Sequence, residues 1–343
     1  MTGILGFMSK RSILLLFGGE SAEHEVSIRS ASNVFDALDK TKYDISLCYI
    51  DRGGQWWHAK EVVERSAMDA QLHPVLGEGK LIDSAGEGIK PDVILPILHG
   101  PNGEDGSVQG LAQLLHVPIV GCEILGSAIC MDKDVAKRLL SQAGVSVVES
   151  VVHRTGQPVP TYDDVRKELG DLLFVKPANL GSSVGVSRVE SAEELDAALA
   201  EAHKHDHKVI IERAITGREL ECAVLGNEKP EASVIGEIMP EETFYSYEAK
   251  YAADSQTKTS ADIELPDGVA DKIRELAVQA YIALECRGLA RVDFFLAEDN
   301  TLYINEINTL PGFTNISMYP QLWQASGVSY PALLDRLVEL ALE

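Results

Sequence analysis

Short apolar runs alternate with glycine-containing turns and with segments of helical spacing in the first part of the chain. The run 13–17 ends at Gly18 and Gly19 and is too short to cross a bilayer, so it predicts a buried parallel strand. Apolar residues then follow helical spacing over 27–38. "SLCYID" and "DVILPILHG" predict further strands, and 107–116 predicts a helix. The pattern indicates an α/β unit with an open parallel sheet, which binds ligands beyond the carboxyl ends of its strands.

Two further units follow. A basic helix in "DKDVAKRLLSQAG" precedes a surface loop in "TGQPVP", so we place a boundary at Asp132. In the next unit an amphipathic helix capped by Ser191 lies between the strands "LLFVKPA" and "KVIIERAI". The remainder has the strands "ELECAVLG", "ARVDFFLA" and "TLYINEIN" and a closing helix from Tyr330, which is typical of an α+β unit. The predicted domains are 1–132, 133–216 and 217–343.

Composition and charge narrow the class of protein. The chain has 343 residues with 45% hydrophobic content, which argues against disorder. Its net charge of −23 repels nucleic acid and anionic membranes, so we expect neither as a partner. The five cysteines are scattered without a CxxC motif, which favours a reducing cytoplasm over a disulfide framework or a zinc site. The apolar run after Lys10 and Arg11 is shorter than the core of a signal peptide.

Charged residues follow the first predicted strand, in "FGGESAEHEVSIRSA". A dinucleotide site is disfavoured because GxGxxG is missing and carboxylates stand where a pyrophosphate would need backbone N–H groups. The carboxylates suit a cation such as a substrate ammonium. For Glu25 alone, the alternative is an acidic first turn that complements the helix dipole.

A loop of small residues follows Lys176 in "VKPANLGSSVGVSRV". Small side chains over 181–185 let backbone N–H groups and hydroxyls approach phosphate oxygens. The loop is not a Walker A motif, and a flexible hairpin is the alternative. Lys133 and Lys176 would supply the point charges that a triphosphate needs, although either lysine alone is more typical of a surface.

Polar pairs occur on two predicted strands near the C-terminus. Arg291 and Asp293 are separated by two residues, as are Glu306 and Asn308, so each pair projects from one face of its strand. If these strands pair, three oxygen ligands and a guanidinium converge. Hard oxygen ligands select Mg²⁺ carried by nucleotide phosphates, although solvent-facing positions on amphipathic strands are the alternative.

Seven segments together closely resemble the D-alanine:D-alanine ligase family of ATP-grasp enzymes, in order along the chain. They are "GGESAEHEVS", "LHGPNGEDGSVQG", "MDKDVAKRLL", "VKPANLGSSVGVS", "FYSYEAKY", "RVDFF" and "NEINTLPGFTNISMYP". The resemblance implies an ATP-grasp fold, with an N-terminal open parallel-sheet domain and ATP held between the other two sheets. It also implies two Mg²⁺ ions with Mn²⁺ as a substitute, a homodimer, and cytoplasmic ligation of two D-alanines for peptidoglycan synthesis. The reaction would pass through D-alanyl phosphate and release ADP and phosphate.

The resemblance assigns the substrate-site residues. Glu23 would receive the ammonium of the first D-alanine, and His99 would lie in the same site. Ser182 and Tyr251 would hold Glu23 and close the "FYSYEAKY" loop. Ser317 would bind the carboxylate of the second D-alanine.

The remaining assignments concern catalysis, nucleotide and metal. Arg291 and the N–H of Gly312 would stabilise the oxyanion that forms when the second amine attacks. The implied nucleotide contacts are Lys133, Lys176, Ser182, Ser183, Glu212, Glu219 and Lys250, with Glu212 near the ribose or the adenine edge and Glu219 near the ribose. The implied metal ligands are Asp293, Glu306 and Asn308. Leu310 replaces a serine that is common in this family, which we consider a minor departure because Gly312 is kept.

Three alternatives remain open. A depsipeptide ligase that joins D-alanine to D-lactate shares nearly all of these motifs, and Tyr251 is the residue that favours the peptide ligase. A metal-dependent hydrolase built on His99, Glu104 and Asp105 would need a second ligand cluster. A non-catalytic nucleotide-binding protein would be expected to lack some of the metal ligands or Arg291, and all are present.

Overall fold

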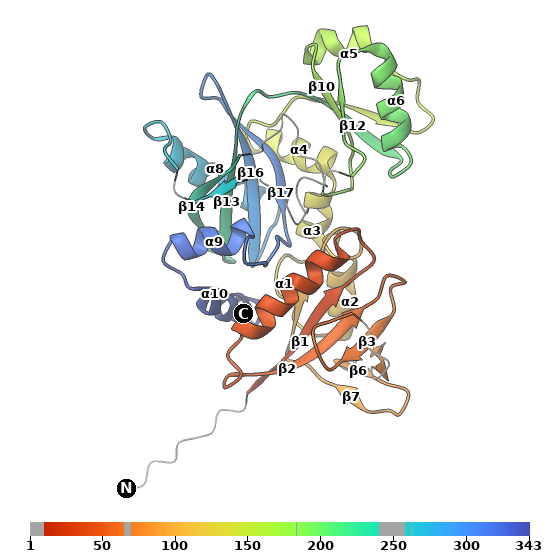
Figure 1. Cartoon of the computed structure of the whole chain (residues 1–343), viewed down its shortest axis with the longest axis vertical. Coiled ribbons are helices and arrows are strands. Elements are labelled where there is room, and N and C mark those ends of the chain that lie inside the picture. Colours follow the sequence, from red (N-terminus) through yellow and green to blue (C-terminus); the bar gives the residue numbers. More distant parts are fainter. Residues whose placement is uncertain (1–9, 65–69, 183, 240–257, 262) are drawn as a thin grey trace.

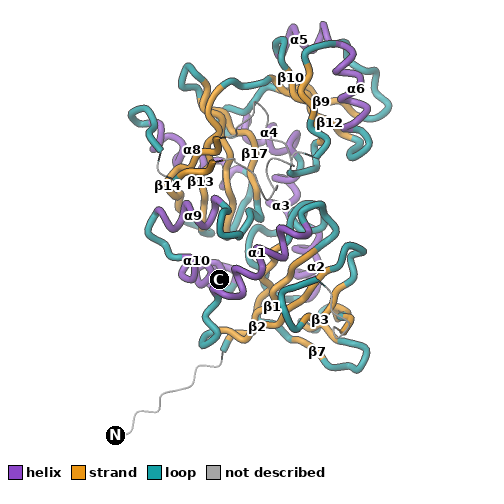
Figure 2. The backbone as a smooth tube through the Cα atoms, in the orientation of Figure 1, coloured by secondary structure: helices purple, strands orange, loops and turns teal. Residues whose placement is uncertain are grey.

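The strands of the described residues form three larger sheets and one small sheet. The structure is a computed structural model that describes residues 10–64, 70–182, 184–239, 258–261 and 263–343. Figure 1 shows the first sheet at the bottom, the second at the upper right and the third at the left. The strands and the helices that cover them are distinguished by colour in Figure 2.

The first sheet has the strand order β4-β3-β2-β1-β8. Its centre is parallel, because β1 pairs in parallel with both β2 and β8. These three apolar strands are β1 (Arg11–Gly18), β2 (Tyr43–Ile50) and β8 (Val93–Ile97). The edge strands are β3 (Trp56–Ala59) and β4 (Ala70–Gln71), and a small separate sheet contains β5 (His73–Val75), β6 (Lys80–Ile82) and β7 (Gly88–Ile89). The predicted parallel strands are confirmed.

Both predicted helices of this unit are present, but the sequence pattern locates the start of α2 better than that of α1. Helix α2 (Ser107–Leu115) matches the prediction closely. Helix α1 (His24–Ala37) begins before the apolar spacing does, because its first turn buries His24 and exposes Glu25. Gly18 and Gly19 make the turn from β1 at φ of 91° and 96°, a region that favours glycine.

The second sheet is antiparallel, with the order β11-β10-β12-β9. Its strands are β9 (Ser150–Arg154), β10 (Leu173–Pro177), β11 (Ser187–Val189) and β12 (Lys208–Arg213). Helices α5 (Tyr162–Leu169) and α6 (Ala192–Ala202) cover it. Ser191 caps α6 as predicted, since its Oγ accepts from the Glu194 N–H at 3.3 Å. Among the described residues, the buried core of this unit lies within 165–211, and Val151 and Tyr162 pack against it.

The third sheet is also antiparallel, with the order β15-β14-β13-β16-β17. Its strands are β13 (Gly217–Leu225), β14 (Glu231–Met239), β15 (Lys258–Ser260), β16 (Leu289–Ala297) and β17 (Leu302–Asn308). The surrounding helices are α3 (Ile124–Met131), α4 (Lys133–Gln142), α8 (Val269–Ala283), α9 (Met318–Ala325) and α10 (Tyr330–Ala341). The strands and the closing helix predicted for this unit are confirmed.

The first and third sheets share one apolar core. Leu15 and Phe17 of β1 belong to the same buried cluster as Phe313, Tyr319 and Leu337. The Phe313 N–H also donates to Ser30 Oγ at 3.3 Å, which joins the loop after β17 to α1. The division into 1–132, 133–216 and 217–343 stays a prediction.

In the described part of the chain, every helix is too short or too polar to span a membrane. The five cysteines are buried and free.

Candidate active site

Carboxylates form a row across three neighbouring strands of the third sheet. In the register of these strands, Glu221 on β13 faces Asp293 on β16, and Asp293 faces Glu306 on β17. Arg291 faces Asn308 two pairs further along. The two strands therefore pair, as the predicted convergence of the polar pairs requires, and Glu221 is an additional acid that was not predicted from the sequence. The sequence feature that could have identified Glu221 is a charged residue inside the apolar strand "ELECAVLG".

Arg291 holds this acidic row together. Its Nε and Nη2 each donate to a carboxylate oxygen of Asp293 at 2.7 Å, and Nε lies 3.1 Å from Glu221 Oε1. Arg291 is buried. Burial lowers its pKa, but the charges of Asp293 and Glu221 outweigh this and hold the pKa above its usual range. The guanidinium is therefore a fixed positive charge in a pocket of acids.

A β-bulge lies beside the acidic row. The register slips after the Asp293–Glu306 pair, so that Asn305 has no partner on β16. Bulges redirect single side chains and are common next to active sites. Here Asn305 Oδ1 accepts from Lys176 Nζ at 3.5 Å, while Glu306 Oε2 lies 3.2 Å from Lys133 Nζ. Both predicted phosphate lysines therefore reach β17 from outside the third sheet.

Glu212 is buried between two lysines. Its Oε2 lies 2.7 Å from Lys176 Nζ, and its Oε1 lies 2.9 Å from Lys137 Nζ. Burial raises the pKa of Glu212, but the two ammonium groups outweigh it and lower the pKa below its ordinary value. Lys137 was not predicted as a site residue. Its position one helical turn after Lys133 could have identified it from the sequence.

The small-residue loop starts beside Lys133. The Lys133 Nζ donates to the Leu180 carbonyl at 2.7 Å. Ser182 has φ of 55°, which is uncommon for a residue other than glycine and marks a locally constrained backbone. Glu219 is near the start of β13, where it pairs with Ile238 of β14 and Phe295 of β16. The roles of Ser182 and Glu219 at a nucleotide stay predictions.

The first strand and helix present Glu23 at a buried position. Glu23 is 7% exposed and directly precedes α1. His24 is fully buried, and its ring nitrogens contact the Gly19 carbonyl and the Tyr49 hydroxyl, so it fixes the turn below Glu23. Glu25 instead points outward and pairs with Arg52 at 2.6 Å.

His99 is two residues after the end of β8. Its Nδ1 donates to the Leu310 carbonyl at 3.1 Å and lies 3.6 Å from Glu104 Oε1. Nε2 is buried without a hydrogen-bond partner among the described residues, so it is available to a ligand. Burial lowers the pKa of His99, but the hydrogen bond to Glu104 and the charge of Glu23 outweigh it and raise the pKa.

A cavity of about 160 Å³ adjoins His99, lined also by Gly19, Glu20 and Asn102. Liquid water takes about 30 Å³ per molecule, so the cavity has room for several waters or a small solute.

The loop after β17 carries Gly312 and Ser317. A Cβ on Gly312 would lie 2.7 Å from Ser317 Oγ, so only glycine fits without displacing that hydroxyl. Ser317 Oγ accepts from the Thr314 N–H at 3.0 Å and lies 2.8 Å from Thr314 Oγ1. Through Leu310 this loop contacts His99, whereas the roles of Ser317 and His99 in two substrate sites stay predictions. Ser183, Lys250 and Tyr251 lie outside the described residues.

Comparison with known proteins shows which family this chain belongs to. Residues 12–122 match a family model described as the D-Ala-D-Ala ligase N-terminus, and residues 139–339 match one described as the D-Ala-D-Ala ligase C-terminus. The chain belongs to the D-alanine–D-alanine ligase family. The resemblance and the ATP-grasp fold inferred from the sequence are thereby confirmed.

Members of the D-alanine–D-alanine ligase family match the chain over nearly its whole length. D-alanine–D-alanine ligase A of Salmonella typhimurium is 48% identical and covers 98% of this chain and 97% of its own. The D-alanine–D-alanine ligase of Shouchella clausii is 47% identical over 98% of this chain and 96% of its own.

Two solved ligases share the fold. The VanG D-Ala:D-Ser ligase of Enterococcus faecalis has a TM-score of 0.88 at 36% identity, covering 97% of this chain and all of its own. The Bacillus anthracis D-alanine–D-alanine ligase complexed with ATP has a TM-score of 0.75 at 30% identity, covering 97% of each chain.

Proposed function

We propose that the chain joins two D-alanines in an ATP-dependent reaction, forming D-alanyl-D-alanine, ADP and phosphate for peptidoglycan synthesis. The observation that carries this proposal is the position of the acidic row. It lies next to Lys133 and Lys176, and the loop that follows β17 carries Ser317 and contacts His99. Phosphate charge, metal and two amino acids would thus meet at one place.

The nucleotide would lie between the second and third sheets. Lys133 and Lys176 would contact its phosphates, and the N–H groups around Ser182 and Ser183 would bind their oxygens. Glu219 and Glu212 would face the ribose. Both oxygens of Glu212 already contact lysines, which supports a second role for this residue in orienting Lys176. Lys250 would add a further phosphate contact.

The oxygen ligands fit Mg²⁺. Asp293, Glu306 and Asn308 supply only hard oxygens from facing strands, and the amide oxygen of Asn308 accepts a hydrogen bond from the Leu310 N–H at 3.1 Å. Such a site would hold two Mg²⁺ ions, or Mn²⁺ in their place. The bound ions would neutralise phosphate charge and orient the oxygens that react.

The chain's own residues would then organise the amino acids. Glu23 would bind the ammonium of the first D-alanine beside His99, leaving its carboxylate to attack the γ-phosphate. Catalysis of phosphoryl transfer is chiefly positioning and charge neutralisation.

Ser317 would bind the carboxylate of the second D-alanine, whose neutral amine attacks the D-alanyl phosphate. Arg291 and the Gly312 N–H would stabilise the developing oxyanion, and Tyr251 with Ser182 would hold Glu23.

We also propose a homodimer located in the cytoplasm. Leu114 on α2 and Leu125 on α3 are each 58% exposed, and these two helices contact each other. Exposed apolar side chains on adjoining helices support a protein contact at this face.

The first test is an assay of purified protein with ATP, Mg²⁺ and D-alanine. We expect equal amounts of ADP, phosphate and D-alanyl-D-alanine. D-serine and D-lactate should be offered in parallel as acceptors, because one structural relative is a D-Ala:D-Ser ligase and a depsipeptide ligase shares the motifs. AMP and pyrophosphate as products would disprove γ-phosphate chemistry, and a stronger preference for D-serine or D-lactate would reassign the acceptor.

A second test concerns His99. Because its pKa is raised in the folded protein, the stability it contributes is present below its unfolded pKa and is lost as pH rises through the folded pKa. We expect the difference in free energy of unfolding between the wild type and His99→Gln to shrink from pH 6 toward pH 9, measured by urea denaturation. The exposed His58→Gln serves as the control. A difference that grows with pH would contradict the raised pKa.

A further inference from the structure

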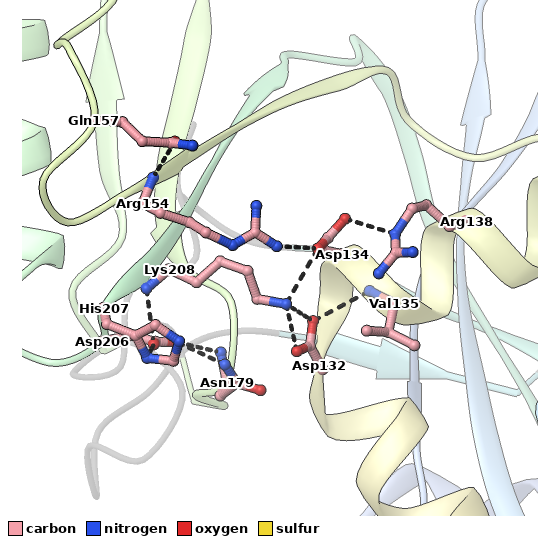
Figure 3. A network of polar contacts seen from close by, with 10 residues as sticks. All are labelled: Asp132, Asp134, Val135, Arg138, Arg154, Gln157, Asn179, Asp206, His207 and Lys208. Atoms are coloured by element: carbon pink, nitrogen blue, oxygen red, sulfur yellow. Dashed lines mark hydrogen bonds and ion pairs between the residues drawn. The ribbon is translucent and has the colours of Figure 1, made fainter.

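We propose that Lys208 and Asp206 are positioning residues that lock two phosphate-contacting elements into one arrangement. The elements are the N-terminus of α4, which carries Lys133, and the loop that starts at Asn179 and leads to Ser182. Figure 3 shows the polar network that connects them. The inference rests on the proposed function, in which both elements contact ATP.

Lys208 anchors the helix. It is 5% exposed, and its Nζ pairs with both carboxylate oxygens of Asp132 and, at 3.1 Å, with Asp134 Oδ2. Asp132 is the N-cap of α4, because its Oδ1 also accepts from the Val135 N–H at 3.1 Å. The ammonium of Lys208 therefore holds the residues on both sides of Lys133.

Asp206 anchors the loop from the same short segment. Its Oδ2 accepts from the backbone N–H and the side-chain amide of Asn179, at 2.9 and 2.8 Å. Its Oδ1 accepts from the Lys208 N–H at 3.0 Å. Burial raises the pKa of Asp206, but these hydrogen bonds outweigh it and lower the pKa, so the carboxylate stays ionised near neutral pH.

Main-chain bonds close the arrangement. The Ala178 N–H donates to the Lys208 carbonyl, and the Lys133 N–H donates to the Ala178 carbonyl, both at 3.0 Å. The Lys133 side chain then reaches both the Leu180 carbonyl and Glu306. The direction of the Lys133 ammonium thus depends on the helix and the loop being held together.

Stability alone is a weak reason for such a network. Burying a lysine with two carboxylates has a desolvation penalty that often exceeds the Coulombic gain, and apolar replacements of similar shape are often as stable. Asp134 also contacts Arg138 at 3.0 Å and Arg154 at 3.2 Å, so the site is well neutralised. Ion pairs of this kind are best attested where they fix a register, which is the role that we assign here.

The experiment compares Lys208→Met with the wild type in the ligase assay and in calorimetric titration with Mg–ATP. We expect the KM and Kd for ATP to rise by about 10-fold to 100-fold, the range seen when residues that orient a ligand group are removed. The KM for D-alanine should stay within about twofold, since Glu23 and His99 lie in the first unit. Lys42→Met, which removes the exposed pair with Asp335, is the matched control and should leave all three constants unchanged.

Two further variants keep the test decisive if Lys208→Met does not fold. Asp206→Asn should weaken ATP binding in the same selective way, and Lys208→Arg should retain most of the affinity because it keeps the charge. A lowered melting temperature with unchanged KM for ATP in the folded variants would overturn the inference and leave the network purely structural.

Lys133→Ala separates this inference from the proposed function. If Lys133→Ala loses ATP affinity while the Lys208 and Asp206 variants keep it, only the positioning role fails. If Lys133→Ala itself binds ATP normally, the proposed phosphate site fails, and the positioning role that depends on it fails too.

Discussion

Glu306→Gln and Asn308→Ala should each reduce turnover by about a thousandfold, because a bound metal contributes several kcal/mol of charge stabilisation. The fold should survive both changes. Neither side chain belongs to an apolar cluster, and Glu306→Gln removes one of three carboxylates that face one another across β13, β16 and β17. Like charges at facing positions oppose folding, and relieving them offsets the loss of the Glu306 pair with Lys133, so we expect the free energy of unfolding to change by no more than about 1 kcal/mol.

The measurement combines initial rates over a range of Mg²⁺ concentration with urea denaturation. Raising Mg²⁺ should restore part of the activity of Glu306→Gln. The control is Glu298→Gln, which neutralises an exposed carboxylate just beyond β16 and should leave the rate unchanged. Near wild-type turnover of Asn308→Ala at ordinary Mg²⁺ would show that the metal is bound elsewhere.

Arg291→Met should lower both stability and activity. It removes the guanidinium that lies between the buried Glu221 and Asp293, and breaking a buried ion pair in this way costs about 3–5 kcal/mol. The residual folded enzyme should also lose about 100-fold to 1000-fold in kcat, the range for removing an oxyanion donor. Urea denaturation and kcat per folded molecule measure the two effects separately.

Two matched variants interpret that result. Arg188→Met removes an exposed arginine that also makes two bonds to a carboxylate two residues away, and should cost less than about 1 kcal/mol. Arg291→Lys keeps the charge but not the two-pronged geometry, so it should recover stability more than activity. Full activity in Arg291→Lys would mean that Arg291 acts by charge alone.

The sequence predicted which side chains share a strand face, but not what they face. Spacing by two placed Glu306 and Asn308 together, because alternation is a local property of any strand. The pairing of Asp293 with both Glu221 and Glu306 depends on strand order, and the bulge at Asn305 depends on how β17 meets β16. Neither is encoded in local spacing.

The buried lysines show the same limit. Lys133 and Lys176 were proposed as phosphate charges in the unit that carries the small-residue loop, and the family motifs contain both, whereas Lys137 and Lys208 resembled ordinary surface residues of a helix and a strand end. Their burial comes from contacts with Glu212, Asp132 and other residues distant in the chain. For α1, the buried first turn was missed because His24 is polar and is satisfied by Gly19 and Tyr49 only in the folded protein.

The distribution of apolar cores determines which parts of the molecule can move. The core that joins the first and third sheets would open if those sheets separated, at about 25 cal/mol for each Å² of apolar surface exposed. Among the described residues, the buried cluster at the second sheet contains only residues of that sheet and of its helices α5 and α6, so this unit could rotate without exposing it. Such a rotation would mainly break polar contacts such as Lys208 with Asp132 and Lys176 with Asn305. The nucleotide side of the site is therefore held mainly by polar contacts and can move with the second sheet. The amino-acid side is held by the apolar core that the first and third sheets share.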